Sequence, residues 1–82
     1  MANEQHDKTY KITVNGVEHI LNHEVLSFDE VVALEFPNAD PNTIFSVSFD
    51  HAKEPKEGEL LKGQSVTINQ NTEFDVDDTG RS

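Results

Sequence analysis

The pair Asn15-Gly16 constrains the fold of this chain more than any other feature, because it joins two stretches of alternating polarity. Apolar and polar residues alternate over residues 9–15, which is the period of a half-buried strand. Val17, His19 and Leu21 continue the alternation on the return, and Ile20 is the exception to it. Asn and Gly both accept the positive φ of the two-residue turn that matches the twist of a hairpin. The sequence therefore predicts an antiparallel hairpin of residues 9–15 and 17–23.

A helix start signal follows the hairpin. Ser27 and Glu30 have the spacing of a capping box, in which each side chain bonds the backbone amide of the other residue. Apolar residues then recur at helical spacing until Pro37, which blocks continuation of the helix. The pattern predicts a short helix over residues 28–36, and a helix this short must pack against a sheet to be stable.

Three later stretches are typical of strands. Thr43–Phe49 alternates clearly, Val66 with Ile68 marks a second strand, and Phe74 with Val76 marks the last one. The element order is thus hairpin, helix, strand, loop and two strands. One helix must cover one face of a mixed four- to five-stranded sheet, since nothing else can bury its apolar side. This is the order of the β-grasp fold, in the α+β class; a small β-barrel is the competing architecture.

The remaining segments complete the predicted domain. Residues 50–59 are charged and contain Pro55, which predicts an exposed loop with at most one helical turn, after which Leu60 and Leu61 re-enter the core. We expect one domain over residues 8–77. A disordered tail is expected at residues 1–7 and a flexible tail at residues 78–82.

Charge and composition exclude several functions. The 82 residues include 16 acidic and 6 basic side chains, for a net charge of −10, and no cysteine. This charge argues against nucleic acid and anionic membranes as partners. Without cysteine there is no disulfide, no thiolate-bound zinc and no cysteine nucleophile. No secretory segment or membrane-length apolar run is present. We therefore expect a cytoplasmic protein whose partners present basic or apolar surface.

Histidines and carboxylates raise metal binding and acid–base catalysis as hypotheses. His19 and His23 have a spacing that would suit zinc on a helix, but both lie on or just past a predicted strand. His6 and His51 lie in a tail and a loop. The EF-hand pattern, the phosphate-binding glycine loop and the nucleophile elbow are absent from the sequence. We expect surface histidines, no metal or cofactor, and no enzymatic activity.

The end of the chain offers a different chemistry. Only Arg81 and Ser82 follow Gly80, and a glycine on a narrow tail can enter an enzyme's site because it has no side chain to clash. The simpler interpretation is an unstructured end. The alternative is a processing site that exposes the Gly80 carboxylate by removal of Arg81 and Ser82. The residues before it that would contact a partner are Asp77, Asp78 and Thr79.

Short motifs along the chain occur in the order found in a known family. These motifs are Tyr10-x-Ile-x-Val14-Asn15-Gly16, Leu60-Leu61-Lys62-Gly63 followed by Ser65-Val66-Thr67-Ile68, Phe74-x-Val76, and Thr79-x-x-Ser82. Together they resemble the bacterial multiubiquitin family, whose members are ubiquitin-like β-grasp domains. The resemblance covers about residues 8–82.

The resemblance implies a protein modifier. Its partners would be a processing peptidase, an adenylating enzyme similar to ubiquitin-activating enzymes, a conjugating-enzyme-like protein and the target proteins. Carried to this sequence, Gly80 would react and Arg81 and Ser82 would be removed. The sequence has no Gly-Gly pair, so the cleavage position stays open. Two other roles also stay open, a non-covalent protein-binding module and a sulfur carrier.

Overall fold

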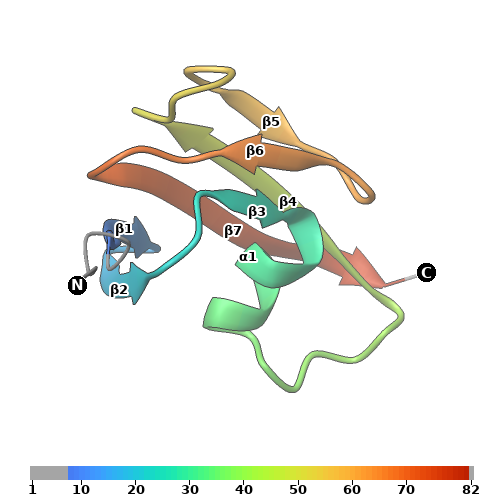
Figure 1. Cartoon of the computed structure of the whole chain (residues 1–82). Helices are drawn as coiled ribbons and strands as arrows, with labels where there is room; N and C mark the ends of the chain where they lie inside the picture. The colour runs from blue at the N-terminus through green and yellow to red at the C-terminus, as the bar shows by residue number, and fades with distance from the viewer. Residues whose placement is uncertain (1–7, 82) are drawn as a thin grey trace.

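A computed structural model of the protein describes residues 8–81, and the tail expected at residues 1–7 lies outside them. One helix packs on a mixed five-stranded sheet, with a separate two-stranded sheet beside it (Figure 1). In chain order the elements are β1 (Tyr10–Val14), β2 (Val17–Leu21), β3 (Val25–Ser27), α1 (Phe28–Glu35), β4 (Thr43–Asp50), β5 (Gly58–Leu60), β6 (Ser65–Thr67) and β7 (Thr72–Arg81). This arrangement confirms the predicted α+β, ubiquitin-like fold.

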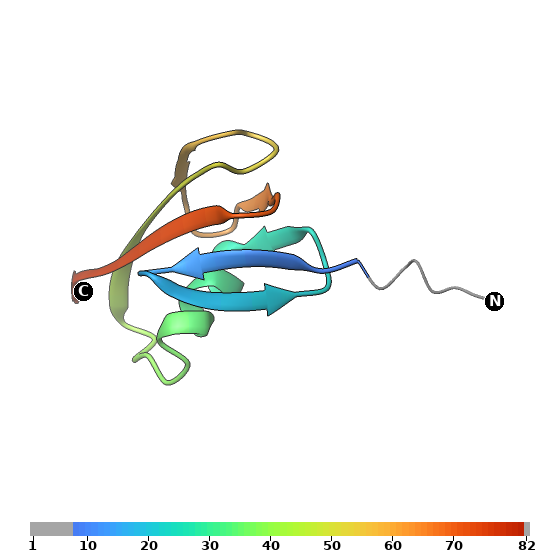
Figure 2. The ribbon, with the colours of Figure 1, turned by 90° about the vertical axis from the view of Figure 1, so that its left-hand side faces the viewer.

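The large sheet has the strand order β2-β1-β7-β4-β5. The central strand β7 is parallel to its neighbour β1, and every other neighbouring pair in this sheet is antiparallel. Figure 2 shows the consequence of the parallel pair: the start of β1 and the end of β7 lie at opposite ends of the domain. The sheet is open, with β2 and β5 at its edges, so the alternative of a closed β-barrel is wrong.

The predicted hairpin is confirmed, and its turn is tied to the centre of the sheet. Asn15 and Gly16 have φ values of 53° and 81°, as the two-residue turn requires. The backbone amide of Asn15 also donates to the carbonyl of Phe74, at 2.9 Å. The turn therefore fixes both the hairpin register and the position of β7 beside β1.

The predicted helix is also confirmed, to within one residue at its end. The Glu30 amide donates to Ser27 Oγ at 3.1 Å, and the Ser27 amide donates to Glu30 Oε1 at 2.9 Å, which completes the capping box. The helix ends at Glu35, and the ring of Phe36 packs on that of Phe45 with centroids 5.1 Å apart. The side chains almost fully buried between helix and sheets include Ile12, Val14, Leu26, Val31, Val47, Val66, Ile68, Phe74 and Val76.

Leu61 and strand β3 differ from the sequence-based expectation. Leu60 is buried as expected, but Leu61 is exposed, because the chain leaves the sheet directly after β5. Strand β3 was not expected at all. It pairs with β6 through Leu26 and Val66, both buried. Three residues are too few to show an alternating pattern, so only the distant partner strand identifies β3.

The last strand is longer than expected. The sequence predicts that this strand ends at Asp77 and that a flexible tail follows from residue 78, whereas β7 continues to Arg81 as the partner of β4. The pairing of β7 with β4 continues to Arg81 because β4 begins at Thr43, which lies opposite Arg81. Asp78 pairs with Phe45 and Gly80 with Ile44, so one extra residue of β7 is accommodated as a bulge between these pairs. The backbone of residues 78–81 is therefore strand rather than free tail.

Candidate functional site

The carboxyl-terminal end of β7 is the first part of the candidate site. Gly80 lies opposite Ile44, and the bulged residue Thr79 donates from its hydroxyl to the Ile44 carbonyl at 2.9 Å. The side chains of Asp77, Asp78 and Thr79 are all exposed. Of the predicted processing residues, Gly80 and Arg81 therefore lie at the end of a strand, and Ser82 lies outside the described residues.

A groove lies directly beside this strand end. We call it the β4 groove; it has a volume of about 580 Å³ and lies between the start of α1, the loop before β4 and the residues after β5. Two large apolar side chains on it are exposed, Ile44 at 49% and Leu61 at 58%. Thr79 also lines it, so the groove and the end of β7 form one continuous surface.

The sequence contained only part of the signal for this groove. Phe45, Val47 and Phe49 occupy the core side of β4, so alternation alone places Ile44 on the other side. Leu61, in contrast, follows buried Leu60 in a Leu-Leu pair, and nothing local indicates that the chain turns away between them. The groove depends on that turn and was not predicted.

The face of the large sheet opposite the core is acidic. Cross-strand partners share a face, and the register aligns exposed carboxylates from strands far apart in the sequence. Lys11 also lies on this face, with its Nζ 3.8 Å from Glu18 Oε2. We call this surface the acidic sheet face, and its carboxylates are Glu18, Asp50, Glu59, Glu73, Asp75 and Asp77.

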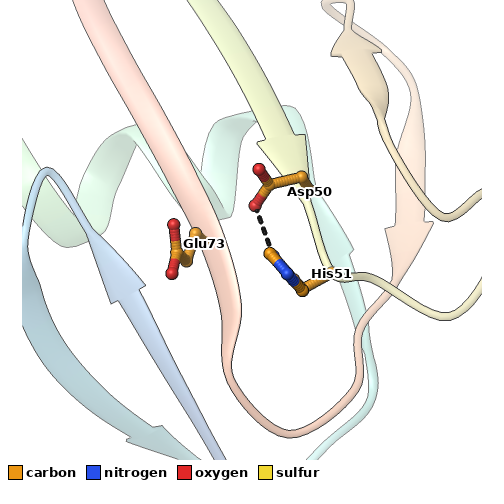
Figure 3. A group of neighbouring side chains, drawn as sticks. All are labelled: Asp50, His51 and Glu73. Atoms are coloured by element: carbon orange, nitrogen blue, oxygen red, sulfur yellow. Dashed lines mark hydrogen bonds and ion pairs between the residues drawn. The ribbon is translucent and has the colours of Figure 1, made fainter.

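One cluster at the end of this face combines a histidine with two carboxylates. His51 Nδ1 lies 2.9 Å from Asp50 Oδ1, and Glu73 lies on the neighbouring strand opposite Asp50 (Figure 3). Hydrogen bonding to Asp50 and the charge of that carboxylate raise the pKa of His51 above its usual 6.5, and Glu73 adds to this effect. The arrangement favours a protonated His51 in a surface ion pair.

The same three residues could each offer one ligand atom to a metal, and these atoms lie within 4.8 Å of one another. However, the side chains of His51 and Asp50 already bond each other, and all three side chains are accessible to solvent. We therefore interpret the cluster as an ion pair, and the absence of a bound metal stays a prediction. The sequence did not predict that Glu73 lies near His51, because this proximity depends on the register of β4 with β7.

The other histidines do not join this cluster. His19 on β2 is half-buried rather than a surface residue, and its Nε2 has no hydrogen-bond partner among the described residues. His23 is exposed, with its Nε2 3.5 Å from Glu30 Oε2. His6 lies outside the described residues. The zinc spacing of His19 and His23 therefore corresponds to no shared helix, as expected from the sequence.

Comparison with protein families gives a match over most of the chain. The family model described as multiubiquitin matches residues 10–80, from the first strand to the end of the last. Comparisons with curated proteins and with solved structures gave no significant match. Within residues 8–81, no helix is long and apolar enough to cross a membrane. The match covers the hairpin, the helix and all strands of the structure, so the chain belongs to the multiubiquitin family.

Proposed function

We propose that this domain is a ubiquitin-like protein modifier whose carboxyl terminus is processed to Gly80. The observation that carries the proposal is the position of Gly80 at the far end of β7, beyond the bulge at Thr79. Past that bulge, the sheet register joins the chain to β4 through the pairs Gly80–Ile44 and Arg81–Thr43. Detaching this end breaks two terminal pairs of the sheet and leaves the pairing of β4 with residues 73–78 of β7 in place. The released glycine can then enter a narrow active site.

The proposed chemistry has four steps, and partner proteins carry them out. Hydrolysis of the Gly80–Arg81 peptide bond by a peptidase would release Arg81 with Ser82 and leave a Gly80 carboxylate. An adenylating enzyme would join this carboxylate to the α-phosphate of ATP and release pyrophosphate. An enzyme thiol would then displace AMP, and an amine of the target protein would displace the thiol. The domain itself supplies the acyl group and the docking surface.

Intact mass spectrometry tests this proposal. The chain is co-expressed with a matching peptidase, adenylating enzyme and conjugating-enzyme-like protein. The expected products are a chain ending at Gly80 and adducts with target proteins. Gly80→Phe should abolish transfer, and the fold should stay intact, because residue 80 is the penultimate residue of β7 and follows the bulge at Thr79. Persistence of the mass that ends at Ser82, with no adduct, would contradict the proposal.

A truncated chain that ends at Gly80 is the matched control. It should be transferred without the peptidase, which separates a failure of processing from a failure of activation. The sulfur-carrier alternative predicts the same trimmed chain with one oxygen replaced by sulfur. Mass spectrometry of the trimmed species therefore distinguishes modification from sulfur transfer.

A non-covalent binding module is the second candidate, and the β4 groove is the observation that favours it. Exposed apolar side chains in a groove of about 580 Å³ are typical of a surface that binds another molecule. This alternative predicts that the partner binds without any conjugation enzyme, and that a chain ending at Thr79, which keeps this groove residue but lacks Gly80, binds it equally well.

A further inference from the structure

Strand β4 has an open edge in the β4 groove. On one side β7 pairs with it along its whole length. On the other side β5 pairs only with Val47–Phe49, and the chain then turns away through Leu61 and Lys62. Among the described residues, no strand pairs with Thr43–Ser46 on that side. An unpaired strand edge is a template for a further strand.

The backbone groups that face the groove can be assigned from the pairing. The Ile44 carbonyl accepts the Thr79 hydroxyl, so the backbone polar groups of Ile44 point toward β7. Successive residues of a strand turn these groups to opposite sides, so the amide and carbonyl of Phe45 point toward the groove. The Thr43 amide is already bonded to the Asp40 carbonyl at 2.9 Å. Phe45 is therefore the residue that an added strand would pair with.

The groove also offers apolar contact beside this edge. Ile44 and Leu61 are half-exposed, and Phe28 and Val32 of α1 line the same groove from the core side. The volume of about 580 Å³ is in the range of clefts that bind ligands or side chains. An added strand could therefore bury one or two apolar side chains as it pairs.

The charged side chains at the rim of the β4 groove indicate which charge an occupant should have. Among the lining residues that the structure describes, the carboxylates are those of Asp29, Asp40 and Glu59, and the cation is Lys62. Lys62 Nζ already lies 3.2 Å from Asp29 Oδ1, so among these described side chains Asp40 and Glu59 remain to attract a cation. Charge complementarity favours an occupant with lysine or arginine next to its apolar residues.

We propose that the β4 groove is a strand-addition site for an extended basic segment of a partner protein. The segment pairs with the open edge of β4 at Phe45, places apolar side chains against Ile44 and Leu61, and turns basic side chains toward Asp40 and Glu59. This site does not depend on processing at Gly80, so it can exist whether or not the domain is conjugated.

The test uses the full-length chain, uniformly labelled with ¹⁵N, and no conjugation enzyme. The probe is a seven-residue acetylated peptide amide that alternates lysine and valine. Titration should shift the amide signals of Thr43–Ser46, Leu61 and Lys62. A peptide N-methylated at alternate residues cannot donate the strand hydrogen bonds, so its affinity should fall by about tenfold or more. A peptide that alternates glutamate and valine should not bind.

Two matched pairs of variants separate the groove from bulk charge. Leu61→Lys and Ile20→Lys each replace an exposed apolar residue by lysine, and Ile20 lies on β2, 62% exposed and outside the groove. Leu61→Lys should weaken binding by about fivefold or more and Ile20→Lys by less than about twofold. If Leu61→Lys does not fold, Glu59→Lys and Glu18→Lys provide the same comparison of peptide affinity. Both carboxylates are exposed, and of the two Glu59 lines the groove.

Several outcomes would overturn the proposal. Shifts confined to Val17–Leu21 would place strand addition on the edge of β2 instead. If the two variants of a pair lost the same amount of peptide affinity, net charge alone, and not the β4 groove, would explain the binding. Undiminished affinity of the N-methylated peptide would exclude backbone pairing with β4.

Discussion

The side-chain amide of Asn15 bonds both backbone groups of Val76. Its Nδ2 donates to the Val76 carbonyl at 3.0 Å, and its Oδ1 accepts from the Val76 amide at 2.8 Å. Asn15 thus continues the parallel pairing of β1 with β7 past the point where β1 turns back. One residue therefore supports the hairpin turn through its φ and the centre of the sheet through its side chain.

Substitution of Asn15 should separate these two contributions. Asn15→Gly keeps the positive φ but leaves both Val76 groups without their partner, which should lower the free energy of unfolding by about 1–3 kcal/mol. Asn15→Ala adds the strain of a positive φ and should lose about 1 kcal/mol more. Urea denaturation followed by circular dichroism measures both values. An Asn15→Gly variant as stable as the natural chain would show that the side-chain bonds contribute nothing.

This contact illustrates which parts of the structure could be predicted. The hairpin, the helix and its capping box depend on neighbouring residues, and the sequence alone predicts them. The bond from Asn15 to Val76 spans 61 positions, and the bulge at Thr79 depends on where β4 begins. A pattern of neighbouring residues predicts neither the hydrogen bond nor the bulge, because both depend on residues far apart in the sequence. For the same reason the sequence indicated Gly80 as a candidate but not the groove beside it.

The capping box should stabilise the helix measurably. Ser27→Ala removes the acceptor of the Glu30 amide and should lower the free energy of unfolding by about 1 kcal/mol. Ser27→Asp keeps a capping oxygen and should cost much less. Thermal and urea denaturation of the two variants give the comparison. Equal stability of both variants would mean that packing of α1, and not its cap, determines helix formation.

The ion pair of His51 should make stability depend on pH. The folded pKa of His51 is raised above 6.5, mainly by the hydrogen bond to Asp50. The contribution of the His51 ion pair to the free energy of unfolding is therefore fully present below pH 6.5, and it is lost as the pH rises through the folded pKa. His51→Asn removes the titrating group and keeps a residue that tolerates the φ of 60° at this position. The urea midpoint of the natural chain should exceed that of the variant, and the difference should be larger just below pH 6.5 than at a pH above the folded pKa of His51.

The Asp50→Asn background provides the control for this titration. Without the Asp50 carboxylate, the main cause of the raised pKa is gone. The pH-dependent difference between chains with His51 and with Asn at this position should shrink accordingly. If the difference stayed the same, another group would be responsible for the pH dependence.

The acidic sheet face should accelerate encounter with basic partners. With a net charge of −10 and exposed Glu73, Asp75 and Asp77 in line along β7, the field of this face extends into solvent. Salt screens such a field beyond about 8 Å at physiological ionic strength. If an adenylating enzyme docks here, stopped-flow association should slow as salt increases. Asp75→Asn should slow it more than Glu57→Gln, because Glu57 is exposed on the loop before β5 and not on this face. An association rate independent of salt, or equal in the two variants, would exclude steering by the acidic sheet face.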